Sequence, residues 1–414
     1  MQGWVITICV LAVLTAYIVW LAGKPSVTPL VDKKAETELR SAVPEHGREG
    51  NEIEVFTGFS SMLQAIEKDV EQAESYVHIL FFKFEDDPVG RSLAGLLARK
   101  VAAGVEVRLM VDDAVNMGRR GFYRDMQADG IQVRGFSPLH IPLIKSDNYR
   151  NHRKIVVVDG RVAYIGGMNI AERYGAGLDW GCWRDTQIRI EGPAVADCEL
   201  AFALDWTHEN APGAALELAS PKYYAEPVSK GGIDVDIVCS GPLGEGPVIM
   251  HRVCEILDSA REYAWLESPY LIPTKEVMAS ICAAARRGVD VRLIIPPRGD
   301  RGVLTPLATK AYIQEALDAG VRIATYDKGY MHSKTIVCDD KIVTVGSTNI
   351  DVRSYVLDLE INAFIYSTEF ASRMKQVFLD DESVSTYIEP ETWKKRPFFQ
   401  KLAEQFAKLF SFQF

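Results

Sequence analysis

The sequence predicts an α/β protein of two similar lobes, each a mixed sheet flanked by helices, related by a pseudo-two-fold axis. Three observations carry this prediction. The chain has 414 residues, which suits two domains better than one. Apolar strand-like segments alternate with helical ones, as they do in α/β proteins. The second half of the chain also repeats the first.

The internal repeat is clearest in two helix–glycine–strand segments. Residues 98–109 read ARKVAAGVEVRL, and residues 283–293 read AAARRGVDVRL. In each copy an alanine- and arginine-rich helical stretch ends at a glycine, a common helix stop, and a β-branched strand follows. An aromatic apolar strand precedes each copy, at residues 76–84 and 263–272. We therefore expect two lobes of one topology, with a site at the seam between them.

The N-terminus carries an uncharged apolar segment from Trp4 to Leu21. About eighteen residues of helix span ~27 Å, close to the hydrocarbon thickness of a bilayer. A cleaved signal peptide would need a basic region before the apolar core, which the first three residues lack. We therefore predict a single-pass transmembrane helix over residues 1–24. The lysines that follow it favour a cytoplasmic catalytic body.

The predicted organisation has five parts. A polar segment with several prolines follows the anchor and is typical of a linker. The net charge of −10 argues against a general nucleic-acid binder, which would need a basic surface. The predicted boundaries are 1–24 for the transmembrane anchor, 25–50 for the linker, 51–225 for the first lobe, 226–390 for the second lobe and 391–414 for a C-terminal amphipathic helix.

The most similar pieces of the two halves are HRKIVVVDGRVAYIGGMN and HSKTIVCDDKIVTVGSTN. Both fit the pattern H-x-K-x4-D-x6-G-[GS]-x-N. One HxK followed by Asp is a weak signal, because most such matches are ordinary strand and turn. Two complete copies at the same place in a repeat indicate a functional site. The candidate catalytic residues of the two motifs are His152, Lys154, Asp159, His332, Lys334 and Asp339.

The position of each motif residue on its strand limits what it can do. Residues i and i+2 of a strand point to the same face, so the histidine and lysine of each copy project together. Asp159 and Asp339 look like tight turns between antiparallel strands, so we expect turn or supporting roles for them and not acid–base chemistry. Small residues after the return strand let backbone N–H groups approach an anion, and the asparagines add side-chain donors. The candidate phosphate-binding residues are Gly167, Asn169, Ser347 and Asn349.

Together these side chains suit a displacement at the phosphorus of a phosphodiester. One imidazole attacks phosphorus to give a phosphohistidine, while the other protonates the leaving alcohol and then deprotonates the incoming alcohol or water. The lysines neutralise the non-bridging oxygens. We expect no cofactor and no metal, since the sequence shows no cluster with metal-ligand spacing.

Residues 151–174, 183–195 and 331–362, which contain both motifs, carry a resemblance to a known family. The chain resembles the phospholipase D superfamily, with its paired HKD motifs, and within it the bacterial cardiolipin synthases. The resemblance implies phosphatidyl transfer between two phosphatidylglycerol molecules, giving cardiolipin and glycerol. It also implies an inner-membrane location in a bacterial cell, with phospholipids and the membrane as partners. It leaves the oligomeric state open.

The resemblance further implies roles for residues in and beyond the motifs. Asp185 and Glu360 occupy positions where the family has an acidic residue that orients the histidine of the opposite lobe. His152 would be the nucleophile and His332 the acid–base partner, although the repeat also allows the reverse order. Such a carboxylate contact fixes the tautomer of an imidazole and stabilises its protonated form.

Two alternatives to phosphatidyl transfer remain open. A phospholipase D-type hydrolase would use the same phosphohistidine, with water in place of the lipid alcohol. A nuclease fits less well, because the chain is acidic and carries a predicted anchor. The chain also departs from the cardiolipin synthase pattern at Gln187, where His is usual, and at Asp358, where Asn is usual. These departures bear on the choice of donor and acceptor lipids.

The C-terminus has an apolar stripe at helical spacing. Basic residues lie before the stripe or on the other side of the predicted helix. A helix of this kind suits an anionic lipid surface, but it also suits packing against the body of the protein, and the pattern does not separate the two. The stripe consists of Phe398, Leu402, Phe406, Phe410 and Phe414.

Overall fold

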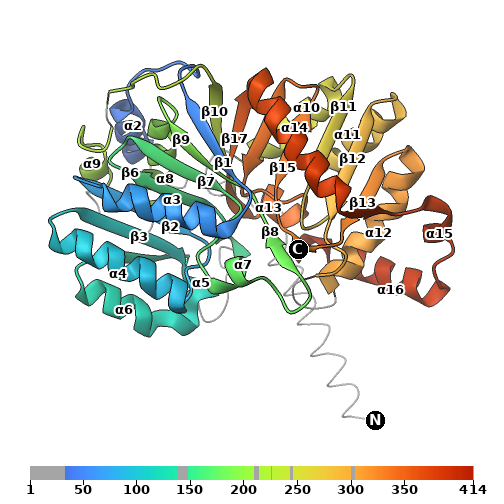
Figure 1. The fold of residues 1–414 in the computed structure, drawn as a ribbon, viewed down its shortest axis with the longest axis horizontal. Helices are drawn as coiled ribbons and strands as arrows, with labels where there is room; N and C mark the ends of the chain where they lie inside the picture. Colours follow the sequence, from blue (N-terminus) through green and yellow to red (C-terminus); the bar gives the residue numbers. More distant parts are fainter. Residues whose placement is uncertain are drawn as a thin grey trace, which may run out of the picture.

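The computed structural model describes residues 33–137, 148–208, 214–224, 226–242, 246–299 and 304–413. Two lobes lie side by side, each with a central sheet covered by helices (Figure 1). The predicted transmembrane helix, residues 1–24, lies outside the described residues. Within the described ranges, no helix combines the length and apolar character needed to cross a bilayer.

The first lobe is built on a seven-stranded mixed sheet in the order β1–β9–β7–β6–β2–β3–β4. Strands β2, β3 and β4 run parallel, and the other neighbours pair antiparallel. All residues of β2 and β6 are buried, as expected for apolar central strands covered on both faces. The strands are β1 (Glu52–Phe56), β2 (Tyr76–Phe81), β3 (Glu106–Asp112), β4 (Gln132–Phe136), β6 (Lys154–Val158), β7 (Val162–Gly166) and β9 (Gln187–Glu191).

The sheet of the second lobe follows the order β10–β17–β16–β15–β11–β12–β13–β18. Replacing each strand of the first sheet by its repeat counterpart gives this order, and β18 is an addition at the edge. The predicted repeat of topology is therefore confirmed. The strands are β10 (Asp234–Ser240), β11 (Tyr263–Glu267), β12 (Asp290–Ile295), β13 (Arg322–Tyr326), β15 (Thr335–Cys338), β16 (Ile342–Gly346), β17 (Asp358–Tyr366) and β18 (Ser385–Tyr387).

Helices cover the sheets and divide the core into three clusters. One cluster lies between the first sheet and α3, α4 and α6, and a second lies between the second sheet and α10, α11 and α12. The helices of the first lobe are α2 (Lys33–Ala42), α3 (Phe59–Glu71), α4 (Pro88–Ala102), α5 (Asp113–Asn116), α6 (Arg120–Ala128), α7 (Glu172–Ala176), α8 (Val195–Thr207) and α9 (Ala214–Leu218). Those that follow are α10 (Val248–Ser259), α11 (Lys275–Arg286), α12 (Leu304–Ala319), α13 (Val352–Val356), α14 (Thr368–Ser383), α15 (Pro390–Lys394) and α16 (Phe398–Lys408).

The third cluster runs through the seam and joins the lobes into one body. It contains Ile165 and Ile188 of the first sheet together with Val345 and Ile361 of the second, and α8 and α14 pack onto it. Apolar burial of this kind is the main favourable term in holding two layers together. A site at the seam is therefore held by a continuous core on both sides.

Two short parallel strand pairs also cross the seam. Strand β5 (Arg150–Asn151) of the first lobe pairs with the start of β17 in the second. In the two-fold-related place, β14 (Gly329–Met331) of the second lobe pairs with β8 (Cys182–Arg184) of the first. These pairs place the residue before each motif histidine beside the residue before each predicted acidic partner.

The two ends of the described chain differ from the sequence-based expectation. Within the predicted linker, residues 25–50, helix α2 packs against α8 and α9 and buries Leu39 completely. The described part of that segment is thus a docked helix and not an extended tether. The predicted single C-terminal helix is divided into α15 and α16, because Pro397 caps the second helix and interrupts the first.

Candidate active site

His152 lies at the seam, between β5 and β6, and two hydrogen bonds to the second lobe fix its position. Its backbone N–H donates to the carbonyl of Leu359 at 2.9 Å. Its ring Nδ1 lies 2.9 Å from Oε1 of Glu360, the next residue along β17. This contact commits Nδ1 to the carboxylate, so Nε2 is the ring nitrogen that can face a substrate.

His332 is held in the same way by the first lobe. Its backbone N–H donates to the carbonyl of Arg184 at 2.7 Å, and its Nδ1 lies 2.5 Å from Oδ2 of Asp185. Each histidine therefore takes both its backbone acceptor and its carboxylate from the opposite lobe. These distances place Asp185 and Glu360 beside the histidines of the opposite lobes, as the resemblance implies, and their role in orienting the imidazoles stays a prediction.

Burial controls the protonation of both imidazoles. It lowers the pKa of His152 to about 4, although the Glu360 carboxylate acts in the opposite sense. Burial, with the charge of Lys334, lowers the pKa of His332 to about 3 against the pull of Asp185. Both rings are therefore neutral near pH 7 in the protein without substrate. An anionic phosphodiester between them would raise both pKa values, since it favours the charged form.

The carboxylates of the two pairs stay ionised despite their burial. Although burial alone would raise the pKa of Asp185, Lys334 and His332 hold it below its usual value. In the same way His152 and Lys154 hold the pKa of Glu360 below its usual value. Each pair is thus a neutral imidazole facing a charged carboxylate, ready to accept a proton on Nε2.

The two motif lysines lie beside their histidines, as the strand spacing predicts. Nζ of Lys154 donates to the backbone carbonyl of His152 at 2.5 Å, and Nζ of Lys334 donates to that of His332. Burial lowers the pKa of Lys154 to about 7. Each lysine also lowers the pKa of the histidine on the other lobe, so the four side chains share one electrostatic site.

The motif aspartates lie at the far ends of their strands from the histidines. Asp159 and Asp339 adopt positive φ values of 53° and 52°, and the residues after them are also positive, as a type I′ hairpin turn requires. The turn prediction is confirmed. Asp159 lies seven positions after His152, at the other end of β6, which is roughly 20 Å at the usual rise. The two aspartates therefore do not join the catalytic group in which the motif pattern had placed them.

Each turn aspartate instead organises the start of a neighbouring strand. The Asp159 carboxylate accepts hydrogen bonds from the backbone N–H groups of Glu74, Ser75 and Tyr76, each at 2.8 Å. Asp339 does the same in the second lobe, with distances of 2.8–2.9 Å. These contacts fix the approach to β2 and β11, the strands next to those that carry the histidines.

Replacing Asp159 by Ala is expected to destabilise the fold without damaging the chemistry. Three backbone N–H groups lose their acceptor, and alanine is strained at positive φ, so the free energy of unfolding should fall by about 3 kcal/mol or more. Asp159→Asn keeps one acceptor and tolerates this φ, so its loss should be smaller. Denaturant unfolding measures both. A kcat that falls as far as in a histidine variant would contradict the structural role.

The glycine of the first motif tail makes room for an acidic partner. The backbone N–H of Gly167 donates to the carbonyl of Thr186 at 2.9 Å, so it is used within the fold and not directed at an anion. A Cβ atom at this position would lie 2.1 Å from Oδ1 of Asp185. Asn169 accepts from the backbone of Lys83 and donates to the hydroxyl of Tyr174.

The serine of the second tail supports the other acidic partner. The backbone N–H of Ser347 donates to the carbonyl of Ile361 at 2.9 Å, and its hydroxyl donates to Glu360. The expected anion-binding role of these two backbone N–H groups is therefore wrong: Gly167 and Ser347 position the carboxylates instead. Asn349 is buried, and its Oδ1 accepts no hydrogen bond from any residue that the structure describes. Its contact with phosphate stays a prediction.

Two further sets of residues were not found from the sequence. Asp205 on α8 accepts from Nη1 of Arg153 at 2.6 Å and from Nδ2 of Asn151 at 2.8 Å, so it fixes both neighbours of His152. Its place in the segment FALDW was the available signal. Aromatic rings surround the imidazoles: Phe82 lies 4.8 Å from His152 between ring centres.

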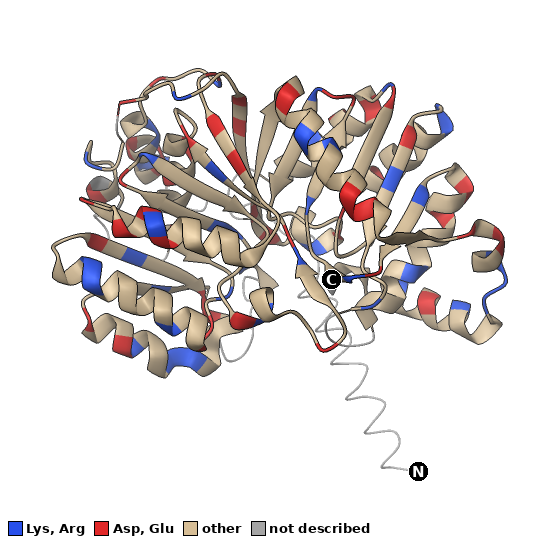
Figure 2. Ribbon diagram, viewed as in Figure 1, with Lys and Arg blue, Asp and Glu red and all other residues tan. Residues whose placement is uncertain are grey.

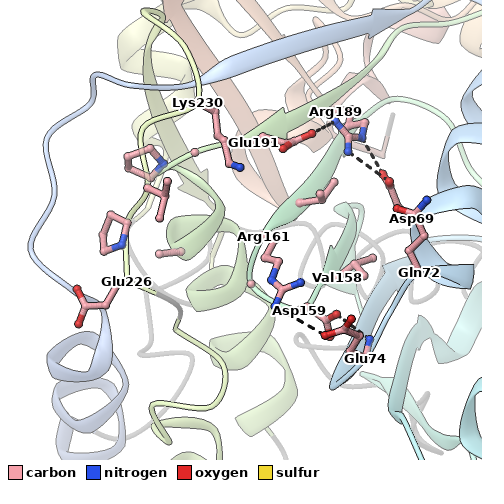
Figure 3. A pocket seen from close by; sticks show the side chains of 17 residues that line it. Asp69, Gln72, Glu74, Val158, Asp159, Arg161, Arg189, Glu191, Glu226 and Lys230 are labelled. Atoms are coloured by element: carbon pink, nitrogen blue, oxygen red, sulfur yellow. Dashed lines mark hydrogen bonds and ion pairs between the residues drawn. The ribbon is translucent and has the colours of Figure 1, made fainter. Parts of the chain in front are cut away.

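A large pocket elsewhere in the first lobe is separate from the histidine site (Figure 3). It lies around the Asp159 turn, at the other end of the sheet. Several of its charged side chains pair with one another: Arg189 pairs with Asp69 at 2.7 Å and with Glu191 at 2.5 Å. Charges of both signs are also interspersed over both lobes (Figure 2). The crossed histidine–carboxylate pairs remain the best candidate for catalysis.

Comparison with known proteins identifies the family of the chain. The family described as "Cardiolipin synthase, PLD-like domain" matches residues 66–183 and 253–381, together more than half of the chain. A protein named cardiolipin synthase from Listeria monocytogenes serotype 4b (strain F2365) is 36% identical over 364 residues, covering 87% of this chain and 75% of that protein. One from Staphylococcus aureus (strain N315) is 37% identical over 368 residues, covering 87% and 73%.

Solved structures show the same fold at low sequence identity. The phosphatidylserine synthase of Haemophilus influenzae matches with a TM-score of 0.62 at 14% identity, over 92% of this chain and 99% of that one. The polyphosphate kinase of Porphyromonas gingivalis matches with a TM-score of 0.56 at 12% identity, over 87% and 53%. At such identities these matches concern the arrangement of the two lobes and not the substrate.

Proposed function

Because the chain belongs to the family of cardiolipin synthases with PLD-like domains, we propose that it transfers a phosphatidyl group from one phosphatidylglycerol to another. The products are cardiolipin and glycerol. The observation that carries the proposal is the pair of crossed contacts, His152 with Glu360 and His332 with Asp185. Two neutral imidazoles with ionised carboxylates behind them suit a reaction that needs a nucleophile and a proton donor in turn.

In the first step, Nε2 of His152 attacks the phosphorus of the donor lipid. The bond between phosphorus and the head-group glycerol breaks, and His332 gives its Nε2 proton to the glycerol oxygen as it leaves. The anionic substrate raises the pKa of His332, so the ring takes up a proton from solvent on Nε2 when the substrate binds, and this is the proton that it donates. Glu360 stabilises the positive charge that develops on His152, as a carboxylate does for an imidazolium.

In the second step, the terminal hydroxyl of another phosphatidylglycerol attacks the phosphohistidine. His332, now neutral, takes the proton from that hydroxyl, the phosphorus–nitrogen bond breaks, and cardiolipin leaves. Lys154 and Lys334 neutralise the non-bridging oxygens in both steps. His152 is the proposed nucleophile, as the family resemblance implies, and a covalent trap can test this assignment.

The products identify the reaction. Full-length protein would be given phosphatidylglycerol in mixed micelles, and the products would be measured by mass spectrometry. Cardiolipin with an equal amount of glycerol is expected. Phosphatidic acid as the main product would instead support the alternative, a phospholipase D-type hydrolase. No turnover of phosphatidylglycerol, alone or with phosphatidylethanolamine added, would contradict both.

The pH dependence of kcat/KM should follow two of the buried groups in the free protein. As the pH falls through about 4, His152 gains a proton and can no longer attack phosphorus. As the pH rises through about 7, Lys154 loses the positive charge that attracts the phosphodiester. We expect kcat/KM to be highest between these values and to fall on both sides. A short-chain soluble donor with a p-nitrophenyl leaving group measures it, because the departure of nitrophenolate needs no proton from His332. A constant kcat/KM from pH 6 to 9 would contradict the role of Lys154.

We also propose that α16 rests on an anionic membrane surface. Five large apolar side chains of this region are exposed: Phe398 (73%), Phe399 (80%), Leu402 (56%), Phe406 (58%) and Leu409 (70%). The opposite side of α16 packs on α12 and buries Glu404 and Ala407, and Arg396 neutralises Glu404. One side of the helix thus packs on the protein, while Phe398, Leu402 and Phe406 of the apolar stripe stay exposed, which supports a lipid surface as their partner.

Charge supports an anionic surface as the partner of α16. Residues 390–413 carry five basic and two acidic side chains, a net charge of +3 in a chain whose net charge is −10. Basic residues beside an exposed apolar face favour lipids such as phosphatidylglycerol. The bacterial inner membrane is accordingly the proposed location, with the predicted N-terminal anchor as a second attachment.

Replacing Phe399 and Leu402 together by Ser is expected to weaken the engagement of lipid surfaces. Loss of two exposed apolar side chains should raise the interfacial KM by about tenfold or more, while kcat stays unchanged. The measurement is the rate in lipid nanodiscs at decreasing surface fractions of phosphatidylglycerol. Val228→Ser, which removes an equally exposed apolar residue from the segment between α9 and β10, is the control. Equal effects of the two changes would contradict the proposal.

A further inference from the structure

The surroundings of the two histidines are not equivalent, although the backbone around them is. Two residues before each histidine, the crossing strands place one residue of each lobe side by side. Beside His152 this pair is Arg150 with Asp358, and beside His332 it is Tyr330 with Trp183. All four side chains are buried. The seam is therefore polar on the His152 side, where Arg150 is cationic, and aromatic on the His332 side.

The aromatic side continues from His332 into the second lobe. The rings of Trp183 and Tyr330 lie 4.9 and 5.8 Å from the His332 ring. The hydroxyl of Tyr330 donates to that of Tyr270 at 3.3 Å. The repeat position of Tyr270 in the first lobe is Lys83, since each stands seven residues after the tyrosine that begins β11 or β2. Lys83 and Tyr270 are thus a third repeat position, after 150/330 and 358/183, at which a polar residue in one copy corresponds to an aromatic residue in the other.

Tyr270 lines a small pocket that is partly open to solvent. Residues of α12, β12 and α15 close it, and the lining is largely apolar. The residues that give it this character are Pro269, Ile295, Pro296, Ile313, Ile388 and Trp393. A concave apolar pocket with few polar groups is the usual form of a site for a hydrophobic ligand.

Two cationic side chains line the same pocket. Arg298 and Lys310 belong to its lining, and the guanidinium of Arg298 lies 4.2 Å from the centre of the Trp180 ring. The Trp180 ring is in turn 6.3 Å from that of Tyr330. From His332 outward the order is thus imidazole, aromatic residues, cations and apolar pocket. A phospholipid that presents its head-group hydroxyl to His332 has this order of groups: alcohol, glycerol, phosphate and acyl chain.

We propose that this pocket is the subsite of the acceptor lipid. The acceptor hydroxyl meets His332, its phosphate pairs with Arg298 and Lys310, and one acyl chain enters the apolar pocket. This inference rests on the proposed function and explains how the same phosphohistidine is directed to a lipid alcohol instead of water. The polar side of the seam, around Arg150 and Asp358, offers an acyl chain no such surface, because burial of charged or polar groups beside a hydrocarbon is costly.

The subsite can be tested by measuring how the phosphohistidine divides between two acceptors, a lipid alcohol and water. The test variant is Thr309→Phe, which fills the pocket from α12, and Gln314→Phe places the same ring on the exposed side of the same helix. Thr309→Phe should lower the ratio of cardiolipin to phosphatidic acid by about tenfold or more, the factor for two methylenes that lose burial. Total consumption of the donor and transfer to 1-butanol, an acceptor without acyl chains, should stay within about twofold of the unchanged protein.

The outcomes separate this inference from the proposed function. Unchanged protein that makes no cardiolipin would contradict the function itself. If it makes cardiolipin but Thr309→Phe keeps the product ratio, or lowers transfer to 1-butanol as strongly, the subsite is wrong. Arg298→Ala covers the case in which Thr309→Phe does not fold, since Arg298 is exposed, and it should lower the same ratio.

A phosphatidylglycerol with a photoreactive acyl chain adds a measurement on the unchanged protein. Adducts should form on β12, α12 and α15, and adducts confined to the first lobe would overturn the subsite.

Discussion

His152→Ala is expected to reduce phosphatidyl transfer by at least about 10⁴-fold, the usual cost of removing a nucleophile that forms a covalent intermediate. His332→Ala should reduce it by a similar factor, because neither the leaving glycerol nor the incoming hydroxyl then has a proton partner. Cardiolipin formation in mixed micelles measures both. His251→Ala, which removes an exposed histidine on α10, is the control and should keep full activity.

The two histidine variants differ when the leaving group needs no proton. With a p-nitrophenyl ester of phosphatidic acid, His332→Ala should release a stoichiometric burst of nitrophenolate and retain a phosphatidyl group on the peptide that contains His152. His152→Ala should show neither. The opposite pattern would make His332 the nucleophile, as the repeat allows. The absence of an adduct from both variants, with rates close to that of the unchanged protein, would contradict a phosphohistidine.

Glu360→Gln is expected to lower kcat by about 10²–10⁴-fold while KM changes little. The amide cannot stabilise positive charge on His152, and it no longer fixes the proton on Nδ1, so the ring can adopt the wrong tautomer. Asp185→Asn should have the same effect through His332. The thermal unfolding temperature should change only slightly, since Gln can still accept the hydrogen bond from Ser347.

A neighbouring residue and a double variant show whether Glu360 acts through His152. Asp358 lies two residues earlier on β17, and burial raises its pKa to about 8, so it is largely protonated near pH 7. Asp358→Asn should therefore have little effect on kcat. Glu360→Gln added to His152→Ala should cause no further loss, because the carboxylate has no imidazole left to orient. Additive losses in the double variant would mean that Glu360 contributes independently of His152.

The repeat in the sequence predicted most of the fold and the centre of the site. Equivalent strands fall in equivalent places because the period-two and helix–glycine–strand patterns depend on local sequence. His152, Lys154 and the turn at Asp159 follow from strand spacing alone. The crossed partners Asp185 and Glu360 lie 33 and 28 residues after their own motif histidines. Their position was available from family resemblance and not from spacing.

The parts that sequence did not predict depend on contacts between distant segments. The tail glycine looked like an anion-binding turn, but Gly167 is small because Asp185 occupies the space beside it. The apolar side of α2 is too short to distinguish from a linker until α8 and α9 cover it. The contrast between Arg150–Asp358 and Tyr330–Trp183 needs the strand pairing across the seam, which no local pattern encodes.

The crossed pairs also determine what becomes of the enzyme when its halves are separated. Neither half is a smaller enzyme, since each would keep an imidazole whose carboxylate and backbone acceptor stayed behind on the other. Two fragments divided between α9 and β10 would regain turnover only by meeting, at a rate that is second order in their concentrations. Turnover by such a split protein would then report association of the halves directly. A substitution that disturbs the carboxylate of one half would likewise alter the position and protonation of the histidine in the other half.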